Sequence, residues 1–249
     1  MLAHLAGYLK LRRTRTILGC FLLSSVLLMT FADVDIRISR MFFDHGFFLA
    51  GQDWSRWLHD SVRGVIVVSL VSVFAIYGYN RVANRSLWDV DGRKVVYLML
   101  VLILGAGLIV NVAFKDHFGR ARPRDIVEFG GSEQFTPAFV VTDACDRNCS
   151  FSSGDSAGAF FTLAFILAAR RKRAVSTASV GFGVLVSASR IATGAHFFSD
   201  TVVSFFVMLL VADALHHHMF RPAPEPLAEY PVRDPGLLAG VARDSPASP

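Results

Sequence analysis

Three cysteines in 249 residues are too few for a disulfide-stabilised scaffold, and glycine recurs with no fixed period that would indicate collagen. Charged residues are also scarce, at 18% of the chain, whereas soluble domains carry about 25%. Hydrophobic residues make up 53% of the chain, which excludes an intrinsically disordered protein. The composition leaves a membrane protein or a soluble protein with an unusually apolar core.

Long apolar runs decide between these two classes. A membrane-spanning helix requires about 20 mostly apolar residues, and its backbone amides must be paired within the segment. Three runs meet this length clearly, and three weaker ones contain or begin at small polar residues. The expected spans are Thr16–Ala32, Val62–Tyr79, Val95–Phe114, Ser152–Ala169, Ala174–Ser189 and Phe197–Leu215. The sequence therefore predicts an all-α polytopic membrane protein with six transmembrane helices in a bundle.

Basic residues are distributed unequally between the two sides of this bundle. An even number of spans places both termini on one side, which carries 15 lysines and arginines, against seven in the opposite loops. The positive-inside rule makes the richer side cytoplasmic, so both termini are expected there. This topology explains the net charge of +5 better than a nucleic-acid surface does. A cleaved signal peptide, which would leave five spans, is the alternative reading of the first run.

The loops and the tail have their own composition. Residues 221–249 hold seven of the nine prolines and no long apolar run, so we expect a disordered cytoplasmic tail after a membrane domain of residues 1–220. The outer loop Asp33–Asp60 is expected to be either a surface helix or a plain connection. Cys145 and Cys149 lie in the second outer loop, where a periplasmic location favours a disulfide over two free thiols.

Polar and charged residues gather at the predicted outer ends of the helices. Ionisable residues at a membrane edge are energetically costly and are therefore functional candidates. On the predicted topology they all fall on one face of the membrane. They are Lys115, Arg122, Ser153, Gly154, Asp155, Arg190, His196 and Asp200.

Five of these residues are suited to binding a phosphate. Lys115, Arg122 and Arg190 supply positive charge and hydrogen-bond donors, and the arginine forks match phosphate oxygens. Ser153 and Gly154 open a predicted helix, where backbone amides and the helix dipole attract an anion. Taken singly, Lys115 and Arg190 also have a structural explanation as side chains that extend to the membrane surface.

The remaining residues are suited to breaking a phosphate ester. His196 is the expected nucleophile, and Asp200 lies four residues later, about one helical turn away. Asp200 can hold one ring nitrogen so that the other faces phosphorus, with histidine itself forming the covalent intermediate. Because three cations neutralise the phosphate charge, no metal ion or other cofactor is implied.

These residues resemble the type 2 phosphatidic acid phosphatase superfamily of integral membrane phosphatases. Its first motif, K-x6-R-P, matches the sequence KDHFGRARP at Lys115, Arg122 and Pro123. Its third motif, S-R-x5-H-x3-D, matches SRIATGAHFFSD at Ser189, Arg190, His196 and Asp200. The resemblance implies a phosphomonoester hydrolase that acts on a membrane lipid without a metal ion.

This chain departs from the family's second motif, P-S-G-H. It reads S-S-G-D over residues 152–155, so the proline and the histidine are both absent. In the family that histidine is taken to protonate the departing alkoxide, whereas an aspartate beside three cations is a poor proton donor. Asp155 either works as an acid in an apolar corner, or the leaving group requires little protonation. A helix N-cap role for Asp155 is compatible with both readings.

With an acidic residue at this position after the segment NCSF, the sequence of this loop is similar to that of the lipid A phosphatases of bacterial inner membranes. This resemblance implies hydrolysis of a lipid A phosphomonoester on the periplasmic side through a phosphohistidine, with the 1-phosphate ahead of the 4′-phosphate. The expected partners are the lipid substrate and the bilayer, with no nucleic acid and no protein partner implied. The expected location is the bacterial inner membrane, as a multi-pass protein.

Three alternatives remain open at this stage. An undecaprenyl-diphosphate or phosphatidylglycerophosphate phosphatase would use the same residues. A lipid phosphotransferase would pass the phosphoryl group from histidine to a second lipid hydroxyl. Outside enzymes, the chain could be a non-catalytic lipid-binding or transport protein, for which the altered second motif is the only support.

Overall fold

The computed structural model describes residue 8 and residues 11–167 and 172–220 of the chain. Contacts divide the chain into two units, Met1–Met219 and Phe220–Pro249, and the expected disordered tail lies outside the described residues. Over the described ranges the chain forms helices and no strand, with only isolated bridges such as Phe43–Phe47. The prediction of an all-α fold is confirmed.

Five helices in the described part of the chain are long and apolar enough to cross a membrane. They correspond to five of the six expected spans, and each extends beyond its predicted bounds at one end or both. They are α2 (Arg12–Thr30), α4 (Asp53–Val82), α5 continued by the wider helical stretch η2 (Gly92–Leu100 and Val101–Phe114), α8 (Lys172–Ala192) and α9 (Phe198–Phe220).

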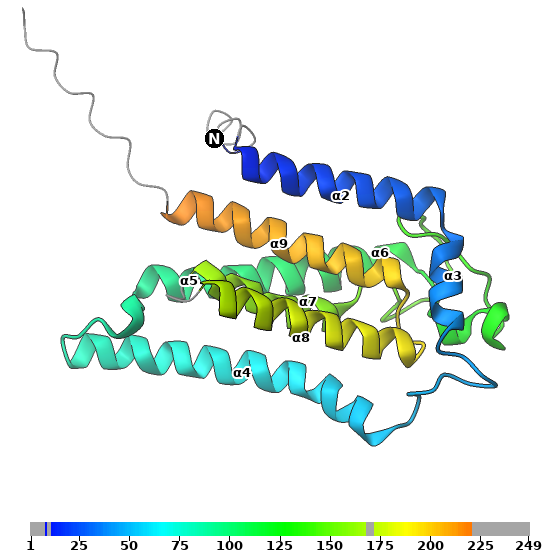
Figure 1. Ribbon diagram of the computed structural model, residues 1–249, viewed down its shortest axis with the longest axis horizontal. Coiled ribbons are helices and arrows are strands. Elements are labelled where there is room, and N and C mark those ends of the chain that lie inside the picture. The colour runs from blue at the N-terminus through cyan, green and yellow to red at the C-terminus, as the bar shows by residue number, and fades with distance from the viewer. Residues whose placement is uncertain (1–7, 9–10, 168–171, 221–249) are drawn as a thin grey trace, which may run out of the picture. The chain divides into compact units, whose positions relative to one another are not determined.

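The fourth expected span, Ser152–Ala169, has a different form. It is built from α7 (Gly154–Phe160) and a tighter helical stretch, η5 (Phe161–Leu167), and its last two residues lie outside the described residues. α7 packs against α4, α8 and η2 (Figure 1). Small residues allow this close packing, since a side chain at Gly183 of α8 would overlap the ring of Phe160.

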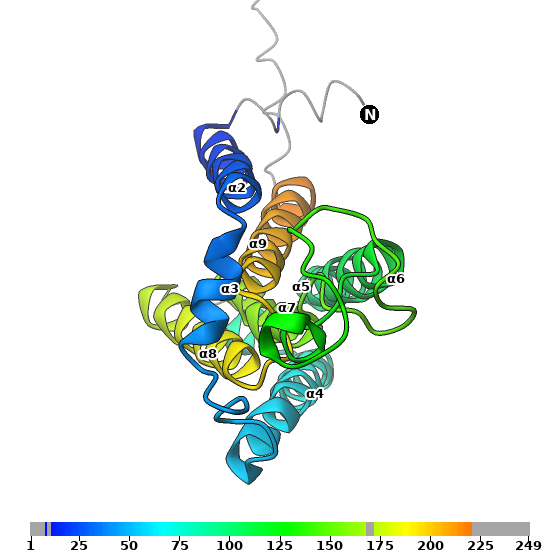
Figure 2. The same cartoon turned by 90° about the vertical axis from the view of Figure 1, so that its right-hand side faces the viewer.

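The loop between α2 and α4 contains a short helix. α3 (Asp33–Arg40) follows α2 directly and lies across the start of α9 in both views (Figures 1 and 2). α4 then begins at Asp53, so Trp54 and Trp57 lie on its first turns, with 51% and 79% of their surfaces exposed. The loop is therefore helical at both ends, in α3 and in the start of α4, and is not a plain connection.

The remaining helical turns are short. Asp91 caps the N-terminus of α5 by accepting a hydrogen bond from the backbone amide of Lys94. The other turns lie between α4 and α5 or between η2 and α7. They are η1 (Leu87–Asp89), α6 (Lys115–Phe118), η3 (Pro123–Asp125) and η4 (Val127–Phe129).

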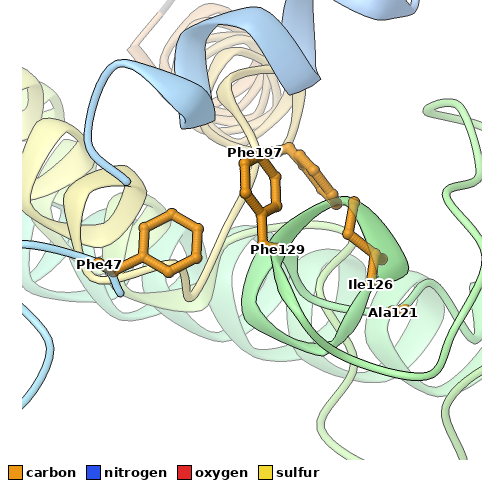
Figure 3. Packing of buried hydrophobic residues seen from close by; sticks show 5 residues of the cluster. All are labelled: Phe47, Ala121, Ile126, Phe129 and Phe197. Carbon is orange, nitrogen blue, oxygen red and sulfur yellow. The ribbon is translucent and has the colours of Figure 1, made fainter. Parts of the chain in front are cut away.

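A cluster of buried apolar side chains holds the loop before α4 and the loop after α6 against the start of α9. Phe47 comes from the loop before α4, and Phe197 immediately precedes α9 (Figure 3). Ala121, Ile126 and Phe129 come from the loop after α6, and the rings of Phe47 and Phe129 lie 5.2 Å apart. Because burying one such side chain stabilises a fold by about 1.5–3 kcal/mol, the cluster fixes the loops on which the candidate site is built.

Candidate active site

His196 lies in the turn between α8 and α9, and only 1% of its surface is exposed. Gly194 in the same turn has a φ of +65°, and the ring of Phe47 occupies the space that a side chain there would need. The His196 Nδ1 atom lies 2.8 Å from the backbone carbonyl oxygen of Ser150. A carbonyl oxygen only accepts hydrogen bonds, so Nδ1 carries the proton and Nε2 keeps its lone pair.

Asp200 lies beside this ring and is fully buried. Its Oδ2 atom is 3.6 Å from His196 Nδ1 and accepts hydrogen bonds from the Ser150 hydroxyl at 2.5 Å and the Phe197 amide at 2.8 Å. The sequence places Asp200 as the direct holder of the ring. In the structure the closer partner is the Ser150 carbonyl, and Asp200 positions the same residue through its hydroxyl.

Arg120 and Asp35 extend this network, and sequence reasoning missed both. Arg120 is 1% exposed and donates to Asp200 Oδ1 at 2.6 Å and to Asp35 Oδ2 at 2.9 Å. Asp35 also accepts from the backbone amide and the hydroxyl of Ser199 in the first turn of α9. In the sequence, only their charge marks Asp35 and Arg120 as candidates for this network. They are 85 positions apart, and no motif joins them.

Three cations form a cluster near His196, since Lys115 and Arg122 act on its ring and Arg190 acts on both of them. Lys115 Nζ donates to the Asn148 side chain at 2.8 Å, and Arg122 Nη2 donates to the Asn148 backbone carbonyl at 2.6 Å. Burial and the charge of Arg122 lower the pKa of Lys115, and Arg190 acts in the same direction. Burial lowers the pKa of Arg122 too, as do Arg124 and Arg190. Lys115, Arg122 and Arg190 are therefore close enough to repel one another.

The same charges act on the imidazole. Burial lowers the pKa of His196 below its usual value of 6.5, and the charges of Arg122 and Lys115 lower it further, while Asp200 opposes them. The neutral form of the ring is therefore favoured near neutral pH. A neutral imidazole has the lone pair that a nucleophile requires.

Ser153 and Gly154 shape the start of α7. The Ser153 hydroxyl accepts from the Ser156 amide and caps the helix. A side chain at Gly154 would lie 2.7 Å from Asn111 Oδ1 and 3.5 Å from Lys115 Nζ. Glycine at this position therefore allows the helix start to approach Lys115 closely.

Asp155 follows on α7 and lies between two nitrogen atoms. Arg190 Nε is 3.0 Å from its Oδ2, and His59 Nδ1 is 3.1 Å from its Oδ1. Both nitrogens are buried without an aligned hydrogen bond, so Arg190 contacts the carboxylate as an ion pair, and His59 does so only when its ring is protonated. Sequence reasoning missed His59, which lies on the first turns of α4, 96 positions before Asp155.

The loop that carries Asn148 is closed by a disulfide bond between Cys145 and Cys149. This bond lies beside the residue that binds both Lys115 and Arg122. A cavity of about 590 Å³ adjoins the site, and Arg190 and His59 both line it. Among the described residues, no three histidine, cysteine, aspartate or glutamate side chains are grouped so as to hold a metal ion.

The structure thus brings the sequence-predicted residues to one end of the helix bundle, the end that carries α6, the end of α8 and the start of α9 (Figure 1). A neutral imidazole beside three cations can bind a phosphate group and attack its phosphorus atom. Such a site in a multi-pass helical protein defines a membrane protein equipped for phosphoryl-group chemistry.

Comparison with known proteins agrees with this class. Residues 95–223 match the PAP2 superfamily, and the chain belongs to this family. The lipid A 4′-phosphatase of Francisella tularensis subsp. novicida is 32% identical over 220 residues, which span 84% of this chain and 97% of that protein. Family membership and this relative support a lipid phosphatase, which is a phosphomonoester hydrolase.

Two further relatives match a shorter region. The lipid A 4′-phosphatases of Rhizobium leguminosarum and Rhizobium etli are 34% and 32% identical over 153 residues, or 61% of this chain. The matched region covers 63% and 57% of those two proteins. No solved structure matches the chain.

Proposed function

We propose that this protein hydrolyses the 4′-phosphate of lipid A through a phosphohistidine at residue 196. The observation that carries the proposal is the contact of His196 Nδ1 with the Ser150 carbonyl, which leaves Nε2 unprotonated beside Lys115 and Arg122. From the sequence alone, the 1-phosphate is expected ahead of the 4′-phosphate. Three relatives are named for the 4′ position, and they favour that position here.

In the first step Nε2 of His196 attacks phosphorus, and the bond between phosphorus and the sugar oxygen breaks. Lys115, Arg122 and Arg190 stabilise the charge on the transferring phosphoryl group, while the Ser150 carbonyl and Asp200 stabilise the ring as it becomes positive. In the second step water attacks the phosphohistidine and releases inorganic phosphate. The same cations act in both steps, because the phosphoryl group stays bound to His196 between them.

Ser153, Gly154 and Asp155 have supporting roles in this proposal. Ser153 holds the start of α7 in place as its N-cap. Gly154 leaves room for Lys115 to reach the phosphate, and Asp155 orients Arg190 through the 3.0 Å contact. The disulfide of Cys145 and Cys149 is proposed to hold the loop that positions Lys115 and Arg122 through Asn148.

We further propose six membrane spans in the bacterial inner membrane, with both termini in the cytoplasm and the site facing the periplasm. The distribution of basic residues supports this orientation. α7 and η5 contribute to the fourth span of this topology. A reporter that is active only in the cytoplasm, fused after residue 220, is expected to give a signal. A signal from a reporter that is active only in the periplasm would instead place the C-terminus there and reverse the proposed orientation.

Purified protein in detergent tests the function directly. With EDTA present, the wild-type protein is expected to release phosphate from the 4′ position of lipid A, and His196→Ala to release none while remaining folded. If phosphate were released only from undecaprenyl diphosphate or phosphatidylglycerophosphate, that lipid would be the substrate in place of lipid A. A phosphorylated lipid acceptor in place of free phosphate would indicate phosphotransfer. Unchanged release by His196→Ala would remove the proposed nucleophile.

A further inference from the structure

The family motif has a histidine at the position that Asp155 occupies in this chain, yet an imidazole is present nearby. His59 reaches the same point from a different helix, since α4 packs directly against α7. Its Nδ1 atom lies 3.1 Å from Asp155 Oδ1, and the two side chains are 31% and 23% exposed. The pair is thus partly buried and still open to a bound molecule.

The geometry assigns different tasks to the two ring nitrogens of His59. Nδ1 faces the Asp155 carboxylate at 3.1 Å, and a group that only accepts hydrogen bonds favours the tautomer with the proton on Nδ1. Nε2 accepts a hydrogen bond from Arg63 Nη2 at 3.2 Å, so it can take up a proton only when this guanidinium moves away. The side chain of Arg63 is 74% exposed and can turn into solvent. When the ring is doubly protonated, Asp155 balances its charge and the proton on Nε2 is the transferable one.

Space for a leaving group lies next to the His59 side chain. His59 and Arg190 line the same cavity of about 590 Å³, so the cavity begins beside one of the three cations of the phosphate site. Phe47 and Phe129 form an apolar part of its wall, and Arg124 adds a positive charge. Aromatic rings and a cation suit a sugar headgroup, which presents both apolar ring faces and polar substituents.

We propose that His59, oriented by Asp155, donates the proton to the leaving sugar oxygen, and that this cavity holds the leaving sugar. The proposal rests on the proposed function. As the phosphorus–oxygen bond breaks and the bond to His196 Nε2 forms, the proton of His59 Nε2 moves to the departing oxygen and yields a neutral hydroxyl. In the second step the attacking water gives a proton back to His59 Nε2, and phosphate leaves His196. Both protons are thereby accounted for.

Dependence on the leaving group separates a proton donor from a structural residue. A donor matters for a poor leaving group such as an alkoxide and little for nitrophenolate, which departs without a proton. We compare octyl phosphate with 4-nitrophenyl phosphate, so the test does not require lipid A to be the substrate. His59→Asn is expected to lose about 10²–10⁴-fold in kcat/KM on octyl phosphate and less than about 10-fold on 4-nitrophenyl phosphate.

His117→Asn is the matched control. His117 is an exposed histidine on α6, bonded through Nδ1 to the Val112 carbonyl, and its replacement is expected to leave both activities unchanged. Activity of His59→Asn on the aryl ester shows that the protein is folded. His59→Gln gives the same comparison should the asparagine variant not yield folded protein. Equal losses on the two esters would overturn the proposal.

A second variant moves the imidazole to the position used by the family. Asp155→His in the His59→Asn background is expected to recover at least about 10-fold of the octyl phosphate activity. Failure to recover, together with equal losses in the single variant, would assign His59 a structural role. Failure of the wild-type protein to act on lipid A, with the leaving-group dependence intact, would instead overturn only the proposed lipid substrate.

Discussion

Arg120 and Asp200 form a buried ion pair, with 2.6 Å between Arg120 Nη1 and Asp200 Oδ1 and at most 1% of either side chain exposed. Arg120 also contacts Asp35 of α3 and lies 4.2 Å above the centre of the Phe197 ring. One guanidinium therefore joins α3, the loop after α6 and the start of α9. The orientation of the His196 ring depends on this junction, because Asp200 also binds Ser150.

Replacing Arg120 with methionine is expected to destabilise the protein by about 3–5 kcal/mol, since it leaves two buried carboxylates without their cation. Arg120→Lys keeps the charge but loses the planar fork, so part of the loss remains. Thermal unfolding in detergent measures both. Arg37→Ala is the control, because Arg37 is 79% exposed and its pair with Asp33 is expected to contribute less than about 1 kcal/mol. A near-neutral Arg120→Met would contradict a structural role for the pair.

The charge state of His196 predicts the acid side of the pH profile. Protonated imidazole has no lone pair, so activity is lost as the pH falls through the pKa of His196. Burial lowers this pKa below 6.5, with Arg122 and Lys115 acting in the same direction and Asp200 opposing. Activity is therefore expected to persist below about pH 6.5 before it declines.

Lys115→Met removes one of the charges that lower the pKa of His196. The acid limb of kcat/KM for 4-nitrophenyl phosphate is therefore expected to move to higher pH in this variant, in addition to any loss of rate. Comparing the two proteins on one substrate cancels the titration of the phosphate group itself. A limb that moves to lower pH would contradict the electrostatic coupling between Lys115 and His196.

Gly154 is expected to tolerate no side chain. A methyl group there would lie 2.7 Å from Asn111 Oδ1 and in ordinary contact with Lys115 Nζ at 3.5 Å, so Gly154→Ala forces the Asn111 amide to shift beside Lys115. Displacements of about 1 Å at a reacting centre reduce rates by about 100-fold, and we expect a loss of kcat of that order. Gly181→Ala on α8 is the control, because nothing lies within 4 Å of its added methyl group. Equal activity of the two variants would show that a side chain at position 154 does not disturb the phosphate site.

The local features of this protein could be predicted from its sequence. Apolar runs indicate five of the long helices, and the spacing of Lys115, Arg122, Arg190, His196 and Asp200 predicts residues that the fold brings to one end of the bundle. Runs and short spacings are properties of neighbouring residues. The start of α4 was missed because its first turns carry charged residues such as Asp53, which lower the hydropathy without breaking the helix.

The contacts between distant segments could not be predicted in this way. Arg120 binds Asp35 across 85 positions, and His59 lies beside Asp155 across 96 positions. Each pair depends on how α3 or α4 packs against helices formed later in the chain. No periodicity or motif encodes that packing, so the sequence marks these residues only as charges near a membrane surface.

Asp213 of α9 holds the start of α2 and the residues before it against the bundle. Its carboxylate accepts from the hydroxyls of Tyr8 and Thr14 at 3.1 and 3.0 Å and pairs with Arg13 at 2.9 Å. Burial and the nearby Asp213 charge raise the pKa of Tyr8 to about 12, so Tyr8 remains a neutral donor at physiological pH. Asp213→Ala is expected to reduce the free energy of unfolding by about 1–3 kcal/mol, because it leaves two buried hydroxyls without their acceptor.

Arg13→Ala separates the ionic part of this cluster from the hydrogen bonds. The Arg13 side chain is 58% exposed, so its removal is expected to change stability by less than about 1 kcal/mol. Both variants are expected to keep the wild-type kcat, because Asp213 lies on the last turns of α9 and the candidate site lies at the first. Thermal unfolding combined with phosphate release measures the two effects together. A loss of kcat in Asp213→Ala without a loss of stability would show that the two ends of α9 are functionally coupled.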